Sequence, residues 1–318
     1  MKRCVLAAVS CFFLALLIPA VLLRYCAPAA DEPAPRLDER RRVSVLLPDG
    51  TVTETSLAEL LNGVLSAEMP ADFPEEALRA QAVASRSYVL YSMEHHRHGE
   101  ADVCCSGACC QAFADADALR ERWGADYDVN AVRIAGAVTD TDGMALYWAD
   151  EPILACFHAA SPGATESSER VWREALPYLR SVSSPETAEN VANLVSVREI
   201  YPEEFRAAVR ESCPAAALDT AAGEWISGIG RDASGRVAQV IIGGVPVPGT
   251  ELRSIFSLRS TAFDLEWTGE VFRFTVSGSG HGVGLSQQGA RLMAGQGCTW
   301  QEILAHYYPG TELRRAEG

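Results

Sequence analysis

The chain has 318 residues, of which 48% are hydrophobic, and this length allows one large domain or two lobes with a substantial core. It contains 27 Lys and Arg against 42 Asp and Glu. The resulting formal net charge of -15 repels phosphate backbones and excludes nucleic acid from the expected partners.

An uncharged apolar run lies near the N-terminus. Residues 4–23 contain no charged side chain, and the run ends at Arg24. Twenty helical residues span about 30 Å, the thickness of a hydrocarbon core, and such a run is longer than a cleaved signal peptide needs. We therefore predict that residues 1–26 are a cytoplasmic tip and a single-pass transmembrane anchor, with the rest of the protein outside the cell membrane. The alternative to an uncleaved anchor is a signal peptide that is cleaved near Cys26.

The remainder divides into a linker and one domain. Residues 27–42 are rich in proline, alanine and charge, which is typical of a linker. Residues 43–318 are the predicted catalytic domain. Helices and strands come there in blocks without regular alternation, so the fold class is α+β. We expect mixed helices and antiparallel strands in two lobes around a substrate groove.

The predicted elements follow in chain order. Capping boxes at Ser56–Glu59 and Thr299–Glu302 each open a helix, and Pro74 begins another that runs to about Met93. Gly297 ends the helix before the last one. Predicted strands and hairpins lie at residues 43–47, 145–148, 153–158, 236–242 and around Thr268–Glu270.

Glu68 stands at an unusual position on the first of these helices. It continues the apolar series Leu57, Leu61, Val64 with spacings of four, three and four, just before Pro70. Burial and the negative end of the helix dipole both raise the pKa of a carboxyl, as a general acid near neutral pH requires. On spacing alone, a glutamate that turns into solvent where the helix frays is the alternative.

Several blocks of the sequence resemble the stage II sporulation protein D family. They include SAEMPADFPEEALRAQAVASRSYVLY at residues 66–91, FHAASPGATESSERVWREALPYLRSV at 157–182 and GHGVGLSQQGARLMAGQGCTWQEILAHYYPGTEL at 280–313. The resemblance covers most of residues 43–314 in order. It implies a lytic transglycosylase of spore-forming bacteria, anchored in the mother-cell engulfing membrane during engulfment of the forespore.

The resemblance also implies which residues form the site. Glu68, in the Glu68-Met69-Pro70 motif, would be catalytic, and Gln81 and Arg86 would be substrate-groove residues. These two lie five residues apart, about 140° around a helix, so they cannot both point the same way. His281, in the glycine-rich segment SGSGHGVG, and His158 are further predicted substrate-binding residues. The glycine segment lacks the spacing and βαβ context of a dinucleotide site, but its glycines allow close approach to a ligand.

The implied mechanism needs a single carboxyl. Glu68 would protonate the glycosidic oxygen between N-acetylmuramic acid and N-acetylglucosamine, then take the proton of the muramyl C6 hydroxyl as it attacks C1, leaving a 1,6-anhydro end. A hydrolase instead needs a second carboxylate at about 5 to 9.5 Å. Asp72, Glu166 and Glu169 are the candidates for that role.

A cysteine cluster is open to two interpretations. In an oxidising compartment, a crosswise disulfide such as Cys104–Cys109 is one. The other is zinc, which takes four Cys or His ligands. Resemblance to clostridial members of the family implies His98, Cys104, Cys109 and Cys110 as ligands of a structural zinc, with Cys109 in place of a family histidine. Cys105 would remain a spare thiol.

We therefore predict a lytic transglycosylase that cleaves peptidoglycan glycan strands, preferably stripped of peptides. The resemblance implies two partners, the amidase stage II sporulation protein P and the membrane protein stage II sporulation protein M. The alternative is a non-catalytic glycan-binding enhancer of a cell-wall amidase. A zinc peptidase is a third interpretation, and the absence of an H-E-x-x-H motif counts against it.

Overall fold

The computed structural model describes residues 36–96 and 98–317. Leu37–Gly318 forms one compact unit, which begins within the segment predicted to be a linker. The apolar run at residues 4–23 lies outside the described residues. Among the residues that are described, no helix is both long and apolar enough to cross a membrane. This finding corrects the predicted localisation as a single-pass protein of the cell membrane.

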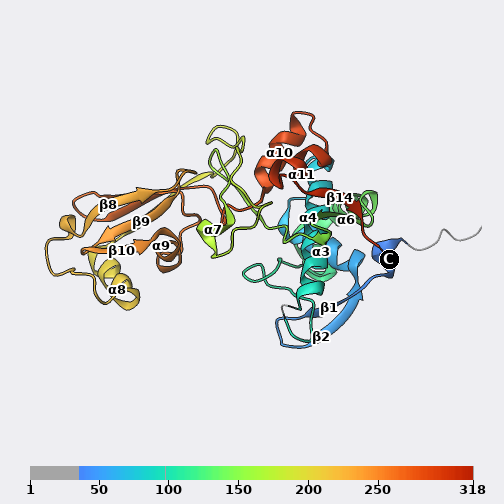
Figure 1. The fold of residues 1–318 in the computed structure, drawn as a ribbon, viewed down its shortest axis with the longest axis horizontal. Helices are drawn as coiled ribbons and strands as arrows, with labels where there is room; N and C mark the ends of the chain where they lie inside the picture. Colours follow the sequence, from blue (N-terminus) through green and yellow to red (C-terminus); the bar gives the residue numbers. More distant parts are fainter. Residues whose placement is uncertain (1–35, 97, 318) are drawn as a thin grey trace, which may run out of the picture. The chain divides into compact units, whose positions relative to one another are not determined.

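The α+β class is confirmed, and the largest hydrophobic core among the described residues forms around one long helix. This helix, α4 (Glu75–His95), follows Pro74 and buries small side chains such as Ala80 and Ala84, so other helices approach it closely. Figure 1 shows it among its neighbours. Those that pack on it are α3 (Leu57–Glu68), α6 (Tyr127–Asp140), α10 (Gln287–Gly295) and α11 (Trp300–Tyr307).

Both predicted capping boxes are confirmed. At the start of α3, Ser56 Oγ accepts a hydrogen bond from the Glu59 backbone N–H at 3.2 Å. The Glu59 carboxylate in turn accepts one from the Ser56 N–H at 3.2 Å. Thr299 and Glu302 make the same exchange at the start of α11. These local contacts fix where both helices begin.

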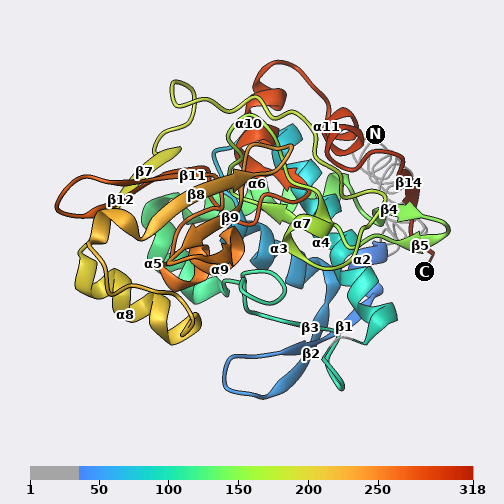
Figure 2. The ribbon, with the colours of Figure 1, turned by 60° about the vertical axis from the view of Figure 1, so that its left-hand side comes forward.

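Short strands surround the first core. Figure 2 shows β1, β2 and β3 together, with β1 antiparallel to β2 and parallel to β3. The C-terminal strand β14 pairs with β4, so the chain ends on a strand after its last helix. The bounds are β1 (Arg42–Leu46), β2 (Val52–Ser56), β3 (Val103–Cys104), β4 (Met144–Trp148), β5 (Glu151–Pro152), β6 (Phe157–His158), β13 (Leu285–Ser286) and β14 (Glu312–Arg315).

One predicted strand is shorter than expected. Residues 153–158 were predicted to be extended throughout, but only Phe157–His158 form a strand, β6. Over residues 153–156 the backbone turns on itself, since the Ala155 N–H donates to the Ile153 carbonyl at 2.8 Å. β6 then pairs in parallel with β13, which brings the segment after β6 beside the glycine-rich segment.

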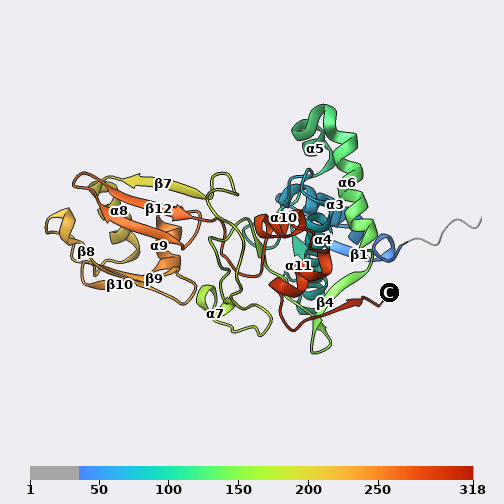
Figure 3. The same ribbon diagram turned by 90° about the horizontal axis from the view of Figure 1, so that it is seen from above.

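A second core contains two three-stranded sheets with orders β11-β12-β7 and β10-β9-β8. Stacked aromatic rings fill it, with Phe205 and Phe272 centroids 4.1 Å apart and Trp225 fully buried beside them. Figure 3 shows these elements on the opposite side of the unit from α3 and α6. They are β7 (Val195–Ile200), α8 (Pro202–Ser212), β8 (Ile226–Arg231), β9 (Val237–Ile242), β10 (Val245–Pro248), α9 (Gly249–Ile255), β11 (Phe263–Trp267) and β12 (Phe272–Ser277).

Short helices complete the described chain. They are α2 (Leu37–Arg40), α5 (Ala116–Trp123), η1 (Gly124–Asp126), α7 (Ser168–Val171) and η2 (Ala222–Glu224). The first of them is anchored from inside the unit, because Asp142 accepts hydrogen bonds from the Leu37 and Asp38 backbone N–H groups at 3.1 and 3.0 Å.

Candidate active site

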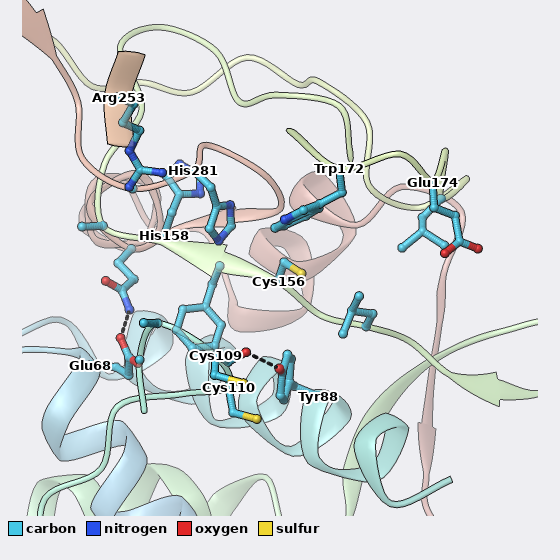
Figure 4. A pocket seen from close by; sticks show the side chains of 18 residues that line it. Glu68, Tyr88, Cys109, Cys110, Cys156, His158, Trp172, Glu174, Arg253 and His281 are labelled. Atoms are coloured by element: carbon cyan, nitrogen blue, oxygen red, sulfur yellow. Dashed lines mark hydrogen bonds between the residues drawn. The ribbon is translucent and has the colours of Figure 1, made fainter. Parts of the chain in front are cut away.

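A pocket of about 630 Å³ gathers residues that are far apart in the sequence. Glu68 reaches it from the end of α3, His158 from β6 and His281 from the glycine-rich segment. Trp172, directly after α7, and Arg253, from α9 of the second core, line it too (Figure 4). Three of the predicted catalytic and substrate-binding residues therefore meet in one place.

Glu68 is half-buried in this pocket and held by two donors. The Ala112 backbone N–H donates to its Oε1 at 2.7 Å, and the Gln287 side-chain amide donates to its Oε2 at 3.4 Å. Burial raises the pKa of Glu68 above its ordinary value, and the two hydrogen bonds oppose that shift in part. The next residue, Met69, leaves the helix with extended backbone and a buried side chain, which fixes the end of α3.

The two histidines of the pocket are held neutral. His158 is buried, with Nδ1 donating to the Val283 carbonyl at 3.2 Å and Nε2 accepting from Ser161 Oγ at 2.6 Å. Burial, reinforced by nearby positive charge, places the pKa of His158 well below its ordinary value and lowers the pKa of His281 to about 4. Neither ring carries a positive charge near neutral pH. The ring of His281 lies 5.1 Å from that of Trp172.

The glycine-rich segment runs very close to β6. Gly280 and Gly284 have φ angles of +101° and +73°. A Cβ at Gly280 would lie 2.7 Å from the His158 Cβ, and one at Gly284 would lie 2.0 Å from the Cys156 carbonyl oxygen. Only glycine combines these angles with that clearance. The close approach brings His281 to the pocket wall.

The His/Cys cluster predicted from the sequence is assembled. One ligand atom from each of His98, Cys104, Cys109 and Cys110 lies within 4.8 Å of the others. His98 Nε2 is 2.9 Å from Cys110 Sγ and 3.9 Å from Cys109 Sγ. No disulfide joins any cysteine in residues 36–96 and 98–317, so the crosswise pairing is not formed there. The cluster could hold a metal ion, and Cys105 lies outside it.

This cluster adjoins the pocket. Cys109 and Cys110 line the pocket together with Glu68. The hydroxyl of Tyr88, on α4, donates to the Cys109 carbonyl at 3.2 Å, a contact drawn in Figure 4. Two residues after Cys110, the chain supplies the Ala112 N–H that binds Glu68. The segment that contains the three cysteine ligands therefore leads directly to the carboxyl.

Comparison with known proteins places the chain in a family. Residues 49–148 match SpoIID, described as stage II sporulation protein. The chain is 34% identical over 270 residues to stage II sporulation protein D of Bacillus amyloliquefaciens, which covers 84% of this chain and 76% of that protein. The corresponding protein of Bacillus subtilis (strain 168) is 33% identical over 272 residues, covering 84% and 77%.

The chain belongs to the stage II sporulation protein D family. This membership confirms the resemblance found in the sequence and associates the chain with sporulation. A further relative is named amidase enhancer, from Bacillus subtilis (strain 168). It is 26% identical over 303 residues, covering 80% of this chain but 40% of that protein.

Two residues predicted to lie in the groove are placed elsewhere in this family member. Gln81 is fully buried on α4, and its amide donates to Ser85 Oγ at 3.1 Å. Arg86 is also fully buried, and its guanidinium donates to both carboxylate oxygens of Asp38. Neither Gln81 nor Arg86 lines the pocket. In this structure Arg86 supports the protein interior by holding α2 against α4.

None of the candidate second carboxylates lines the pocket that Glu68 shares with His158 and His281. Glu166 is buried and receives hydrogen bonds from the Ser167 N–H at 2.7 Å and Ser234 Oγ at 2.6 Å. Glu166 and Glu169 line a separate hollow of about 200 Å³. Asp72 is exposed and lines another hollow, to which Glu68, Met69 and Pro70 also contribute.

Sequence reasoning missed several residues of the pocket. Ala112 contributes only its backbone, and Gln287 becomes a partner of Glu68 across 219 positions of sequence. Neither carries a local signal. Trp172 did carry a local signal, because it is an aromatic residue among charged residues at the centre of a block that resembles the family. Its side chain is 41% exposed in the structure. Arg253 comes from the second core, which no local pattern connects to Glu68.

Proposed function

We propose that the chain is a lytic transglycosylase that cleaves the bonds between N-acetylmuramic acid and N-acetylglucosamine in peptidoglycan during sporulation. The single observation that supports this most strongly is the carboxyl of Glu68, half-buried in a pocket, with a pKa raised by burial. A group of that kind keeps a proton to higher pH than an exposed glutamate, as a general acid requires. Membership of the sporulation family and likeness to an amidase enhancer support a cell-wall role.

In the proposed reaction, Glu68 acts twice. It donates its proton to the glycosidic oxygen as the bond from that oxygen to muramyl C1 breaks. The carboxylate then accepts the proton of the muramyl C6 hydroxyl, whose oxygen bonds to C1. One C–O bond breaks and one C–O bond forms within the glycan, and the C6 hydroxyl proton replaces the one that Glu68 donated, so no water is consumed and the product ends in 1,6-anhydro-N-acetylmuramic acid.

The two donors on Glu68 suit both halves of this cycle. Burial favours the protonated acid before the reaction, and the Ala112 N–H and the Gln287 amide stabilise the carboxylate between the two proton transfers. Because one carboxyl serves as acid and then base, no second carboxylate is needed beside it. Glu174 also lines the pocket, but Figure 4 places it at the opposite end from Glu68.

Product analysis tests the proposal. Purified protein and the Glu68→Gln variant are incubated with peptide-free glycan strands, and the products are analysed by mass spectrometry. We expect wild-type protein to release 1,6-anhydro ends and the variant to lose a factor of about 10² to 10⁴ in rate. Reducing ends without the anhydro bridge would indicate a hydrolase and contradict the proposal.

The second candidate is a glycan-binding protein that enhances an amidase, which the name of one relative favours. It predicts that wild-type protein and Glu68→Gln enhance an added amidase equally and that neither cuts glycan. We further propose that an amidase, stage II sporulation protein P, removes the peptides first, and that stage II sporulation protein M is a second partner. Co-purification with each protein tests these two pairings.

We also propose that the His/Cys cluster holds a structural zinc ion. The donor set fits, because one imidazole and three thiols within 4.8 Å match a tetrahedron whose Zn–S bonds are about 2.3 Å. Bound zinc would fix the segment that leads to Ala112, and four protein ligands leave no position for a reacting water.

We expect about one zinc per chain by elemental analysis and loss of the metal in Cys110→Ser. Cys105→Ser is the matched control and should retain it; equal metal content in both variants would contradict the assignment.

A further inference from the structure

Arg253 places a cation in the wall of the pocket. It lies on α9, is half-buried, and its Nε donates to the Leu258 carbonyl at 3.2 Å. Within residues 36–96 and 98–317, no carboxylate forms an ion pair with it. A guanidinium has five N–H donors, so one carbonyl leaves most of them available to the pocket.

The guanidinium is held in position by the chain around it. The Leu258 N–H donates to the Arg253 carbonyl at 2.9 Å, while the Arg253 side chain donates to the Leu258 carbonyl. These reciprocal bonds fix both ends of the residue. The side chain therefore loses little conformational freedom when it binds a ligand, as a prearranged recognition group requires.

The surroundings of Arg253 leave its charge uncompensated. Burial lowers its pKa, and no acidic neighbour in the described part of the chain opposes that shift. His158 and His281 are neutral, and the positive charge of Arg253 helps to keep them so. In Figure 4 the two histidines lie between Arg253 and Glu68. A half-buried cation of this kind is stabilised when an anion enters the pocket.

We propose that Arg253 binds the lactyl carboxylate of an N-acetylmuramic acid residue in the pocket and thereby selects strands that have lost their peptides. The inference rests on the proposed function, because it requires peptidoglycan glycan as the ligand. In a peptide-free strand of alternating N-acetylglucosamine and N-acetylmuramic acid, the lactyl carboxylate is the charged group. A stem peptide converts that carboxylate to a neutral amide, so the charge that Arg253 recognises is present only after the peptide is removed.

The difference between the two strands is expected to be measurable. A charge-assisted, two-point contact between guanidinium and carboxylate is stronger than a hydrogen bond to a neutral amide oxygen. From the usual strength of hydrogen bonds to charged groups, the preference in kcat/KM should be about 10- to 100-fold. It should appear mainly in KM, because the lactyl group does not change charge in the reaction.

The experiment compares two forms of one substrate. Peptide-free glycan strands are used directly, or after carbodiimide coupling with ammonia converts their lactyl carboxylates to carboxamides. Wild-type protein should prefer the acid form, and Arg253→Gln should cleave both forms at the rate at which wild type cleaves the carboxamide. Arg253→Lys should retain part of the preference. Arg259→Gln is the matched control, because Arg259 is an exposed arginine shortly after α9 that does not line the pocket, and this variant should behave as wild type.

The outcomes separate this inference from the function on which it rests. If wild-type protein cleaves both forms equally well, the role of Arg253 is refuted while the transglycosylase proposal stands. If it cleaves neither form, the proposed function fails and the inference fails with it. Calorimetry measures the binding of the acid and carboxamide strands to Glu68→Gln and to the double variant Glu68→Gln with Arg253→Gln. The Glu68→Gln substitution prevents turnover during the measurement. Loss of the acid preference in Arg253→Gln with unchanged thermal unfolding would support recognition, whereas equal weakening of both ligands would contradict it.

Discussion

Replacement of Arg86 by methionine should separate support of the fold from contact with the glycan. Arg86 is 0% exposed and Asp38 is 2% exposed. The Arg86 Nη2 lies 2.6 Å from Asp38 Oδ2, and its Nη1 donates to the Met144 carbonyl at 3.0 Å. Methionine fills a similar volume without charge. The substitution therefore leaves the buried Asp38 carboxylate without the Arg86 donor and removes the hydrogen bonds to the Met144 and Val138 carbonyls.

The loss of these contacts sets the expected decrease in the free energy of unfolding. Removal of one partner of a buried ion pair lowers the free energy of unfolding by about 3–5 kcal/mol. The total free energy of unfolding of a typical domain is only about 5–15 kcal/mol. Each 1 kcal/mol shifts the midpoint of thermal unfolding by about 2–4 °C in a unit of this size, so we expect a decrease on the order of 6–20 °C. The double variant Arg86→Met with Asp38→Leu removes both charges and should recover part of the loss.

Urea unfolding followed by tryptophan fluorescence measures these stabilities, and release of anhydro ends is measured at a temperature where each variant is folded. We expect folded Arg86→Met to keep most of its activity, in contrast to Glu68→Gln. If Arg86→Met unfolds like wild type but fails to cleave glycan, Arg86 acts on the substrate and the structural argument is refuted.

Two further predictions concern the pocket itself. Because burial raises the folded pKa of Glu68 above its ordinary value of 4.5, the folded state binds the proton more tightly than the unfolded state, and stability falls as pH rises from that value through the folded pKa. Glu68→Gln should therefore unfold at higher urea than wild type at pH 8 and gain little at pH 4; a variant less stable at pH 8 would contradict the raised pKa. Gly284→Ala should lower the stability by about 1–3 kcal/mol in thermal unfolding, because a Cβ there would lie 2.0 Å from the Cys156 carbonyl oxygen. Gly269→Ala has a similar positive φ but nothing within 4 Å, so equal losses in the two variants would show that the close contact is unimportant.

Local signals in the sequence were sufficient for the helices near the site. The Ser56 capping box and the apolar spacing predicted α3 and placed Glu68 at its end on the buried side. The Thr299 capping box predicted α11 in the same way. These features depend on residues within four positions of one another, so they can be recognised without knowledge of the fold.

Features that depend on distant partners could not be predicted. The helical phase separated Gln81 from Arg86, but it could not show that Arg86 meets Asp38, 48 residues earlier, inside the protein. Gln287 and Arg253 likewise reach the pocket only because the strands and both cores place them there. A charged residue on a helix has the same local pattern whether it faces a ligand or a buried partner.

The protonation state of Glu68 decides whether this carboxyl can act as a general acid. The carboxyl signal is obtained as the difference between ¹³C NMR titrations of protein with labelled glutamate and of its Glu68→Gln variant. We expect Glu68 to titrate above the ordinary pKa of 4.5, because the pocket disfavours the charged form. A pKa at or below that value would mean that the carboxyl is ionised like an exposed glutamate and cannot supply the first proton.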